Sequence, residues 1–382
     1  MSFKMEKIYN QSGWLYKDAQ KEVFITELGG HMMPVNFHCK DGSVIKPYFC
    51  SPWQEEPARD FSGGGEVLAP LRGDFFCLPF GGNAEPFHGV QYPAHGETAC
   101  FAWEDGKAIP QADGVKLEFT FQMKRMPGKV TKRIGLKKNQ NALYIEHEVS
   151  GCEGRFPVSH HSILSFPEKD EKMYLSFGKF ELGETCPGIF SNPANKEFGF
   201  LPSGKVFTSI EEMPTKFKDP AVYDYSTYPS PVGYADLFTI FKKPSETPAW
   251  TAACYPKRGY IWFALKNAAA LPNTCIWVAN EGRYEDPWNG RTRCLGVEDG
   301  CSYFDSGVKQ SCEENDLTKR GWPTAMEFRA DKPTTVRMLQ GVVQIPPTFG
   351  KVKQANFLSD GVCFTDVFGA TAMADIDWKF LM

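Results

Sequence analysis

Apolar and polar residues alternate along several segments of the chain. In residues 115–123 every odd-numbered position is apolar and every even-numbered position is polar, and residues 142–149 show a similar period of two. Successive side chains of a β-strand point to opposite faces of a sheet, so this pattern is typical of a strand that buries one face. Both segments are therefore predicted to be half-buried strands.

Further strand-like runs are separated by turn-forming residues. They lie at residues 23–28, 173–177, 237–241, 260–265, 274–279, 336–345 and 372–381. The 35 Gly and 28 Pro residues that punctuate them are typical of many short strands joined by turns. The best candidate for a small helix is residues 209–213. With no repeat and no linker-like composition break, we expect an all-β protein in which residues 1–382 form one domain of stacked sheets.

Composition and charge narrow the classes of partner. Aromatic residues make up 14% of the chain, which favours strands and the core between two sheets. The net charge of −4 gives no basis for binding nucleic acid or an acidic membrane surface. The basic stretch at residues 124–138 is interleaved with apolar residues, so we interpret it as the solvated face of a sheet.

The cysteines and the first residues of the chain bear on its compartment. Twelve Cys are scattered singly, with no CxxC pair. The first 18 residues contain no apolar run like that of a signal peptide, and no apolar segment approaches the length of about 20 residues that spans a bilayer. Free thiols in a reducing cytoplasm are the expected state.

Two polar residues stand out in a stretch rich in Gly, Pro and aromatic residues. Arg72 lies between Leu71 and Gly73, and its fixed fork of five donors suits vicinal sugar hydroxyls or an anionic substituent. His95 precedes Gly96 in a Pro- and Gly-rich loop, where a ligand has access to it. An ion-pair role for Arg72 and a structural role for His95 are the alternatives.

Two further candidates lie on predicted strands. His160 and His161 are adjacent, so at most one of them faces any one pocket. Glu298 follows an apolar run and precedes Asp299 and Gly300 at a strand end, a position that favours a raised carboxyl pKa. The alternative for Glu298 is a structural bond to nearby backbone or to an Arg.

The order of these residues along the chain resembles the aldose 1-epimerase (galactose mutarotase-like) superfamily, near the hexose-6-phosphate mutarotases. The motifs that carry the resemblance are Arg72-Gly73, Pro79-Phe80-Gly81, His95-Gly96, His161-Ser162-Ile163-Leu164-Ser165 and Cys294-Leu295-Gly296-Val297-Glu298. The resemblance implies a large antiparallel β-supersandwich. It also implies His161 as general acid, Glu298 as general base, Arg72 and His95 as ligands of the sugar hydroxyls, and no cofactor.

The implied reaction is the interconversion of sugar anomers by ring opening and closure. Glu298 takes the proton of the anomeric hydroxyl while His161 protonates the ring oxygen, and the roles reverse when the ring closes. We expect the two side chains in one pocket, several ångströms apart with a ring's width between them. This chemistry pairs an ionised carboxylate with a protonated imidazole, which their mutual attraction favours.

The sequence departs from the family pattern at three places. Ala99 stands where the family usually has Arg, so one expected cation is missing and a sugar phosphate is in doubt as substrate. His160 stands where Asn or Leu is usual. The family's binding Asp has only a candidate, Asp236. Trp288 and Asn289, just upstream of the predicted strand of Glu298, are candidates for a stacking platform and a hydroxyl contact.

Two other functions stay open beside the mutarotase hypothesis. A non-catalytic carbohydrate-binding protein on the same fold would use the same small-molecule sugar partner without turnover. A metal site is the third possibility, with His88, His95, His160, His161 and Glu298 as potential ligands. Their spacing matches no HExxH or Cys/His metal pattern, so we expect no metal.

Overall fold

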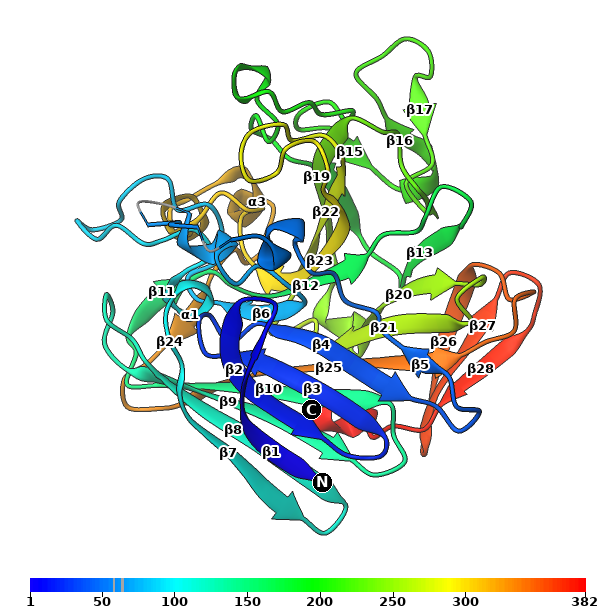
Figure 1. Cartoon of the computed structure of the whole chain (residues 1–382). Coiled ribbons are helices and arrows are strands. Elements are labelled where there is room, and N and C mark those ends of the chain that lie inside the picture. Colours follow the sequence, from blue (N-terminus) through cyan, green and yellow to red (C-terminus); the bar gives the residue numbers. More distant parts are fainter. Residues whose placement is uncertain (58, 63–64) are drawn as a thin grey trace.

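Two large antiparallel sheets form the body of the protein (Figure 1). The computed structural model describes residues 1–57, 59–62 and 65–382. The larger sheet has twelve strands. In spatial order they are β1 (Ser2–Ile8), β2 (Gln11–Lys17), β3 (Lys21–Thr26), β4 (Met32–His38), β6 (Asp74–Cys77), β12 (Val158–Ser165), β23 (Arg293–Cys301), β22 (Asn273–Asn280), β19 (Tyr234–Phe241), β14 (Leu182–Thr185) and β15 (Val206–Phe207), with β5 (Val44–Ile45) paired to β4.

The second sheet has nine strands and packs against the first through the main hydrophobic core. Its strands are β18 (Thr227–Tyr228), β13 (Met173–Phe177), β20 (Ala249–Tyr255), β21 (Tyr260–Lys266), β25 (Thr334–Gln344), β10 (Ala142–Ser150), β9 (Lys129–Lys137), β8 (Gly114–Gln122) and β7 (Glu104–Gln111). The stacked, antiparallel, all-β architecture expected from the sequence is confirmed, while the prediction of one domain over residues 1–382 stays a prediction.

Smaller elements cover the two large sheets. A three-stranded sheet of β26 (Val352–Leu358), β27 (Gly361–Asp366) and β28 (Thr371–Ala374) packs on the outer face of the nine-stranded sheet through a second core (red in Figure 1). Two short pairs are β11 (Gly154–Phe156) with β24 (Met326–Phe328) and β16 (Met213–Pro214) with β17 (Val222–Tyr223). The helices are α1 (Glu97–Cys100), α2 (Val308–Cys312), α3 (Asp316–Lys319) and the 3-10 turns η1 (Pro52–Glu55), η2 (Glu66–Leu68), η3 (Pro193–Asn195), η4 (Ile210–Glu212), η5 (Pro244–Glu246) and η6 (Trp378–Leu381).

The strand predictions agree with the structure over most of their length. In β8 the alternating residues 115–121 are buried at odd positions and partly exposed at even ones. The helical candidate at residues 209–213 forms η4, whose N-cap Ser209 accepts a hydrogen bond from the backbone of Glu211. The prediction of a strand over residues 372–381 is wrong in its second half, because β28 ends at Ala374 and η6 follows. There Tyr144 Oη accepts a hydrogen bond from the backbone of Asp377 and holds the chain against the nine-stranded sheet.

The basic stretch at residues 124–138 contains β9 and carries two kinds of cation. Arg133 forms ion pairs with Glu118, Glu146 and Glu148 on the outer face of its sheet, in line with a solvated sheet face. Lys132, in contrast, is fully buried between the sheets and donates to the carbonyl of Gly30 at 2.7 Å. Burial lowers the pKa of Lys132 to about 8.

Within the part of the chain that the structure describes, no helix has the length and apolar character needed to cross a bilayer. A cytoplasmic location stays a prediction.

Candidate active site

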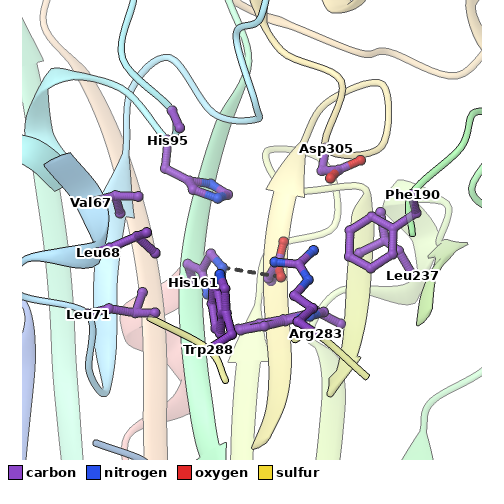
Figure 2. Close-up of a pocket in the computed structure, with 13 residues that line it drawn as sticks. Val67, Leu68, Leu71, His95, His161, Phe190, Leu237, Arg283, Trp288 and Asp305 are labelled. Carbon is purple, nitrogen blue, oxygen red and sulfur yellow. Dashed lines mark ion pairs between the residues drawn. The ribbon is translucent and has the colours of Figure 1, made fainter. Parts of the chain in front are cut away.

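A cavity of about 260 Å³ lies over the outer face of the twelve-stranded sheet (Figure 2). This volume is slightly below the usual range for ligand pockets, about 300–1,000 Å³, which favours a ligand of single-ring size. Strands β12, β19, β22 and β23 form its floor, and connecting loops form its walls. The lining residues are Val67, Leu68, Leu71, Ala94, His95, His161, Phe190, Leu237, Trp277, Arg283, Trp288, Glu298 and Asp305.

His161 and Glu298 meet at the floor of this cavity. Strands β12 and β23 are antiparallel neighbours, and their register places His161 directly opposite Glu298. Both side chains are almost fully buried, and His161 Nε2 lies 3.3 Å from Glu298 Oε1. The structure therefore brings the two residues into one pocket. Their separation differs from the expected ring's width, because directly opposed residues of paired strands have side chains in contact.

The adjacent histidines divide between the two faces of β12. His160 points into the core between the sheets, where its Nδ1 lies 3.7 Å from Asp74 Oδ2. His161 faces the cavity, as strand alternation requires. The His161 ring stacks on Phe75 with centroids 4.6 Å apart, and His31 stacks on the other face of Phe75 at 3.9 Å. This three-ring stack fixes the plane of the His161 imidazole.

Gly296 makes room for the carboxyl group of Glu298. The two residues are two positions apart on β23 and so share a face of the sheet. A Cβ atom at position 296 would lie 2.9 Å from Glu298 Oε1 and 3.0 Å from Trp277 Cβ. The glycine in Cys294-Leu295-Gly296-Val297-Glu298 therefore lets the carboxyl lie back over the strand toward His161.

His95 reaches the cavity from a loop that is fixed by backbone geometry. His95 has φ of 59° and Gly96 has φ of 83°, and a Cβ at position 96 would lie 2.3 Å from the carbonyl carbon and oxygen of Leu78. The backbone N–H of His95 donates to the carbonyl of Gly81 at 2.8 Å. Its imidazole stands nearly perpendicular to that of His161, with centroids 5.0 Å apart.

Arg283 and Asp305 also line the cavity, and sequence reasoning missed both. The Arg283 guanidinium carbon lies 5.0 Å from the ring centroid of Phe190, 5.1 Å from that of Trp288 and 5.6 Å from that of Trp277. Arg283 follows Gly282 in a loop with no motif of its own. The single feature of the sequence that could have selected it is its charge close to Trp288. Asp305 follows Tyr303-Phe304, and nothing local marks it as a site residue.

The acidic groups of the cavity resist ionisation. Burial, reinforced by the nearby Asp305 carboxyl, raises the pKa of Glu298 well above its ordinary value, although the Arg283 guanidinium opposes the shift. Removal from water likewise raises the pKa of Asp305 to about 6. The protonated form of Glu298 is thus favoured, whereas Asp305 with its pKa of about 6 loses its proton as pH rises toward neutrality.

The histidines of the cavity resist protonation. Burial lowers the pKa of His161 well below its ordinary value, with the neighbouring His95 and His31 as secondary causes. Burial and Arg283 lower the pKa of His95 to about 4. The resting pair is therefore a neutral imidazole beside a neutral carboxyl, which is the reverse of the ionised pair expected from mutual attraction alone.

Several buried polar atoms at the cavity have no hydrogen-bond partner within the described ranges. They are His95 Nδ1, His161 Nδ1, Trp277 Nε1, Arg283 Nε and Glu298 Oε2. Buried polar groups of native proteins are almost always paired with protein, water or a ligand. Five residues of one cavity lining each have such an atom, which favours a polar ligand there.

Arg72 lies outside the lining of this cavity. It is fully buried, and its guanidinium donates to the carbonyls of Pro70, Ile8 and Tyr9 and to Gln54 Oε1. These bonds tie the turn after β1 to the loop before β6. Its position supports a structural role and gives it no contact with the cavity.

Of the remaining candidates, one lines the cavity and two do not. Trp288 lines the cavity, whereas Asn289 is exposed and donates to Asp286 Oδ1 at 3.3 Å. Asp236 lies on the opposite face of β19 from Leu237 and lines a neighbouring cavity of about 190 Å³. Its carboxyl accepts bonds from the backbone N–H groups of Phe200 and Leu201 and from Tyr225 Oη.

A metal site was the third possibility from the sequence. Across the ranges that the structure describes, no three His, Cys, Asp or Glu side chains gather as potential metal ligands.

Comparison with known proteins places the fold. No model of a known protein family matches the sequence, and no curated protein matches it. Among solved structures, a proposed aldose 1-epimerase from Escherichia coli K12 superposes with a TM-score of 0.54 at 12% identity, covering 90% of this chain and 100% of the other. A proposed mutarotase from Salmonella typhimurium gives 0.57 at 13% identity, covering 90% and 94%. A galactose mutarotase-like protein from Lactobacillus casei gives 0.52 at 12%, covering 86% and 99%.

These likenesses establish the architecture. The chain has the galactose mutarotase-like β-sandwich fold, as the resemblance of its motifs implied. At such low identity they show the fold alone, so the activity has to be argued from the site.

Proposed function

We propose that this protein interconverts the anomers of an aldose by acid/base opening and closure of the sugar ring. The observation that carries the proposal is the contact between His161 Nε2 and Glu298 Oε1 at the floor of a cavity with unpaired polar atoms. The mutarotase-like fold adds support, because solved structures that share it are described as aldose 1-epimerases and mutarotases.

The contact suits the two oxygens that take part in the reaction. The anomeric hydroxyl oxygen and the ring oxygen are bonded to the same carbon. An acid and a base that lie side by side can therefore reach both of them from one edge of the sugar, without a ring's width between them. Glu298 accepts the proton of the anomeric hydroxyl, and His161 delivers a proton to the ring oxygen as the bond between that oxygen and the anomeric carbon breaks.

The pair holds the same number of protons before and after one turnover. A neutral carboxyl beside a neutral imidazole contains as many protons as a carboxylate beside an imidazolium. Burial favours the neutral form in the free protein, whereas a hydrogen bond from the anomeric hydroxyl to the carboxylate favours the ionised form. Ring opening regenerates the neutral form, and closure on the other face of the aldehyde runs the same transfers in reverse.

The other lining residues support binding and orientation of a sugar. Trp277 and Trp288 stand at 83° to each other and offer flat apolar surface to the carbon face of a sugar ring. His95 and the indole N–H of Trp277 provide groups for its hydroxyls.

An anomer-equilibration screen tests the proposal. Freshly dissolved single anomers of glucose, galactose, mannose, xylose and glucuronic acid are followed by polarimetry and by exchange NMR, with and without the folded protein. We expect equilibration of at least one aldose to be accelerated in proportion to protein concentration. Folded protein that accelerates none of them contradicts the proposal. Sugar binding without acceleration would leave the carbohydrate-binding alternative.

A further inference from the structure

We infer that the sugar bound in this cavity carries a single carboxylate group, as a hexuronic acid does, and that the guanidinium of Arg283 binds that carboxylate. The sugar part of this inference rests on the proposed function, whereas the carboxylate part rests on Arg283 itself.

Arg283 is held in a fixed position at the cavity wall. Its side chain is 18% exposed, and rings of Phe190, Trp277 and Trp288 lie within 5.6 Å of its guanidinium carbon. Aromatic faces attract a guanidinium and restrict its rotamers. In Figure 2 the guanidinium points to the same space as His95 and His161, and Glu298 lines that cavity too. A guanidinium ordered in this way needs little further ordering when it binds an anion.

Most of its donors are left for a ligand. Glu197 is its ion-pair partner, with 3.3 Å between Arg283 Nε and Glu197 Oε1. Across the described ranges no side-chain or backbone oxygen accepts a hydrogen bond from the guanidinium, and Nε itself is without one. An arginine has five N–H donors, so the four on its terminal nitrogens are available to the cavity.

The charges around the cavity favour one negative charge over two. Arg283 is the single Lys or Arg among the lining residues described by the structure, and Glu197 already neutralises part of its charge. Glu298 and Asp305, the acidic residues of the lining, add no positive charge to this space. A doubly charged phosphate would therefore lack a second cation. A carboxylate matches both the charge and the planar, two-pronged geometry of the guanidinium.

Methyl glycosides test the inference apart from catalysis, because their rings do not open. Calorimetry compares methyl glucuronide and methyl galacturonide with methyl glucoside, methyl galactoside and methyl glucoside 6-phosphate. We expect at least one uronide to bind about tenfold or more tighter than its neutral counterpart and tighter than the phosphate. The preference should weaken as salt concentration rises.

Variants assign the preference to Arg283. Arg283→Gln should reduce the ratio of uronide to neutral affinity to near one, and Arg283→Lys should retain part of it. Arg291→Gln is the matched control, because Arg291 lies in the same loop but is exposed and outside the lining. It should keep the full ratio. Thermal unfolding checks that each variant is folded.

The outcomes separate this inference from the proposed function. Equal or tighter binding of the neutral glycoside, tighter binding of the phosphate, or an undiminished ratio in folded Arg283→Gln protein would overturn the inference. A uronide preference that depends on Arg283, in a protein that equilibrates no aldose, would uphold the inference and contradict the proposed function. Equilibration of neutral aldoses without any uronide preference would uphold the proposed function and contradict the inference.

Discussion

His161 Nε2 and Glu298 Oε1 lie 3.3 Å apart because the two residues are directly opposite in the register of β12 and β23. The sheet itself therefore brings together the two residues of the proposed acid/base pair, and no loop has to close to do so. A slip of one residue between these strands would turn one of the two side chains into the core.

Removal of either member of the pair should lower turnover strongly while binding persists. We expect Glu298→Gln and His161→Asn to lower kcat for anomer equilibration by about 10²-fold or more, the range for general acid/base groups. Binding of a methyl glycoside, measured by calorimetry, should weaken only modestly. Binding that collapses together with turnover would assign these residues to sugar recognition. Wild-type activity in either folded variant would contradict the proposed mechanism.

Gly296→Ala should impair activity by displacing the Glu298 carboxyl. The new Cβ would lie 2.9 Å from Glu298 Oε1, so this side chain has to move away from His161. We expect kcat to fall about tenfold or more and the free energy of unfolding to fall by about 1–3 kcal/mol.

Gly135→Ala is the matched control for this substitution. Gly135 lies on β9 in the other large sheet, and its Cβ would come within 3.1 Å of Tyr144 Cβ. This variant should lose stability without losing kcat. Equal activity of the two variants at the same folded concentration would show that Gly296 has no special relation to Glu298.

Arg72→Met should destabilise the protein more than it affects substrate binding. The substitution leaves three backbone carbonyls and Gln54 Oε1 without their buried donor. We expect the free energy of unfolding, measured in urea, to fall by about 2–4 kcal/mol. KM should change less than about threefold, because Arg72 does not line the cavity. A large rise in KM with unchanged stability would restore the role in sugar binding that its motif implies.

Asp305→Asn should stabilise the protein increasingly as pH rises. The folded-state pKa of about 6 lies above the ordinary value of 3.8, so the native protein binds this proton more tightly than the unfolded chain does. The resulting stability is fully present below the ordinary pKa and is lost as pH rises through the folded-state pKa. The Tm of Asp305→Asn minus that of the wild type should therefore grow between about pH 4 and pH 7 and then level off.

Circular dichroism melts at constant ionic strength measure this difference. Asp360→Asn is the control, since Asp360 is exposed between β26 and β27 and its Tm difference should stay flat. A flat difference for Asp305→Asn as well would contradict the raised pKa.

Local sequence patterns predicted most of the strands. The alternation in β8 and the apolar runs of β13, β19, β21, β22 and β25 depend on residues a few positions apart, so burial of one or both faces is visible in the sequence. The segment after Ala374 was mispredicted, because its apolar residues pack as a 3-10 turn onto a sheet that is distant in the chain.

The residues of the candidate site also divide into those that a local pattern could select and those that it could not. The order of His95, His161 and Glu298 along the chain was enough to select three residues of the cavity. The alternation of β12 also separated His161 from His160. Arg72 and Asp236 were selected by the same kind of reasoning, yet most of their partners are backbone groups that a motif does not reveal. Arg283 and Asp305 come from loops whose positions depend on long-range contacts, such as the 2.6 Å bond from the backbone N–H of Gly82 to the carbonyl of Asp305.

The sequence by itself therefore determined most of the strands, the fold class and the selection of His161 and Glu298 as the proposed acid/base pair, since each depends on short-range periodicity or on the order of short motifs. The tertiary structure alone decided that His161 and Glu298 are in contact, that burial keeps this pair neutral at rest, and that Arg283 faces the pair from an aromatic enclosure. These properties arise from strand register, loss of water and the meeting of distant loops, and the linear order of residues encodes none of them locally.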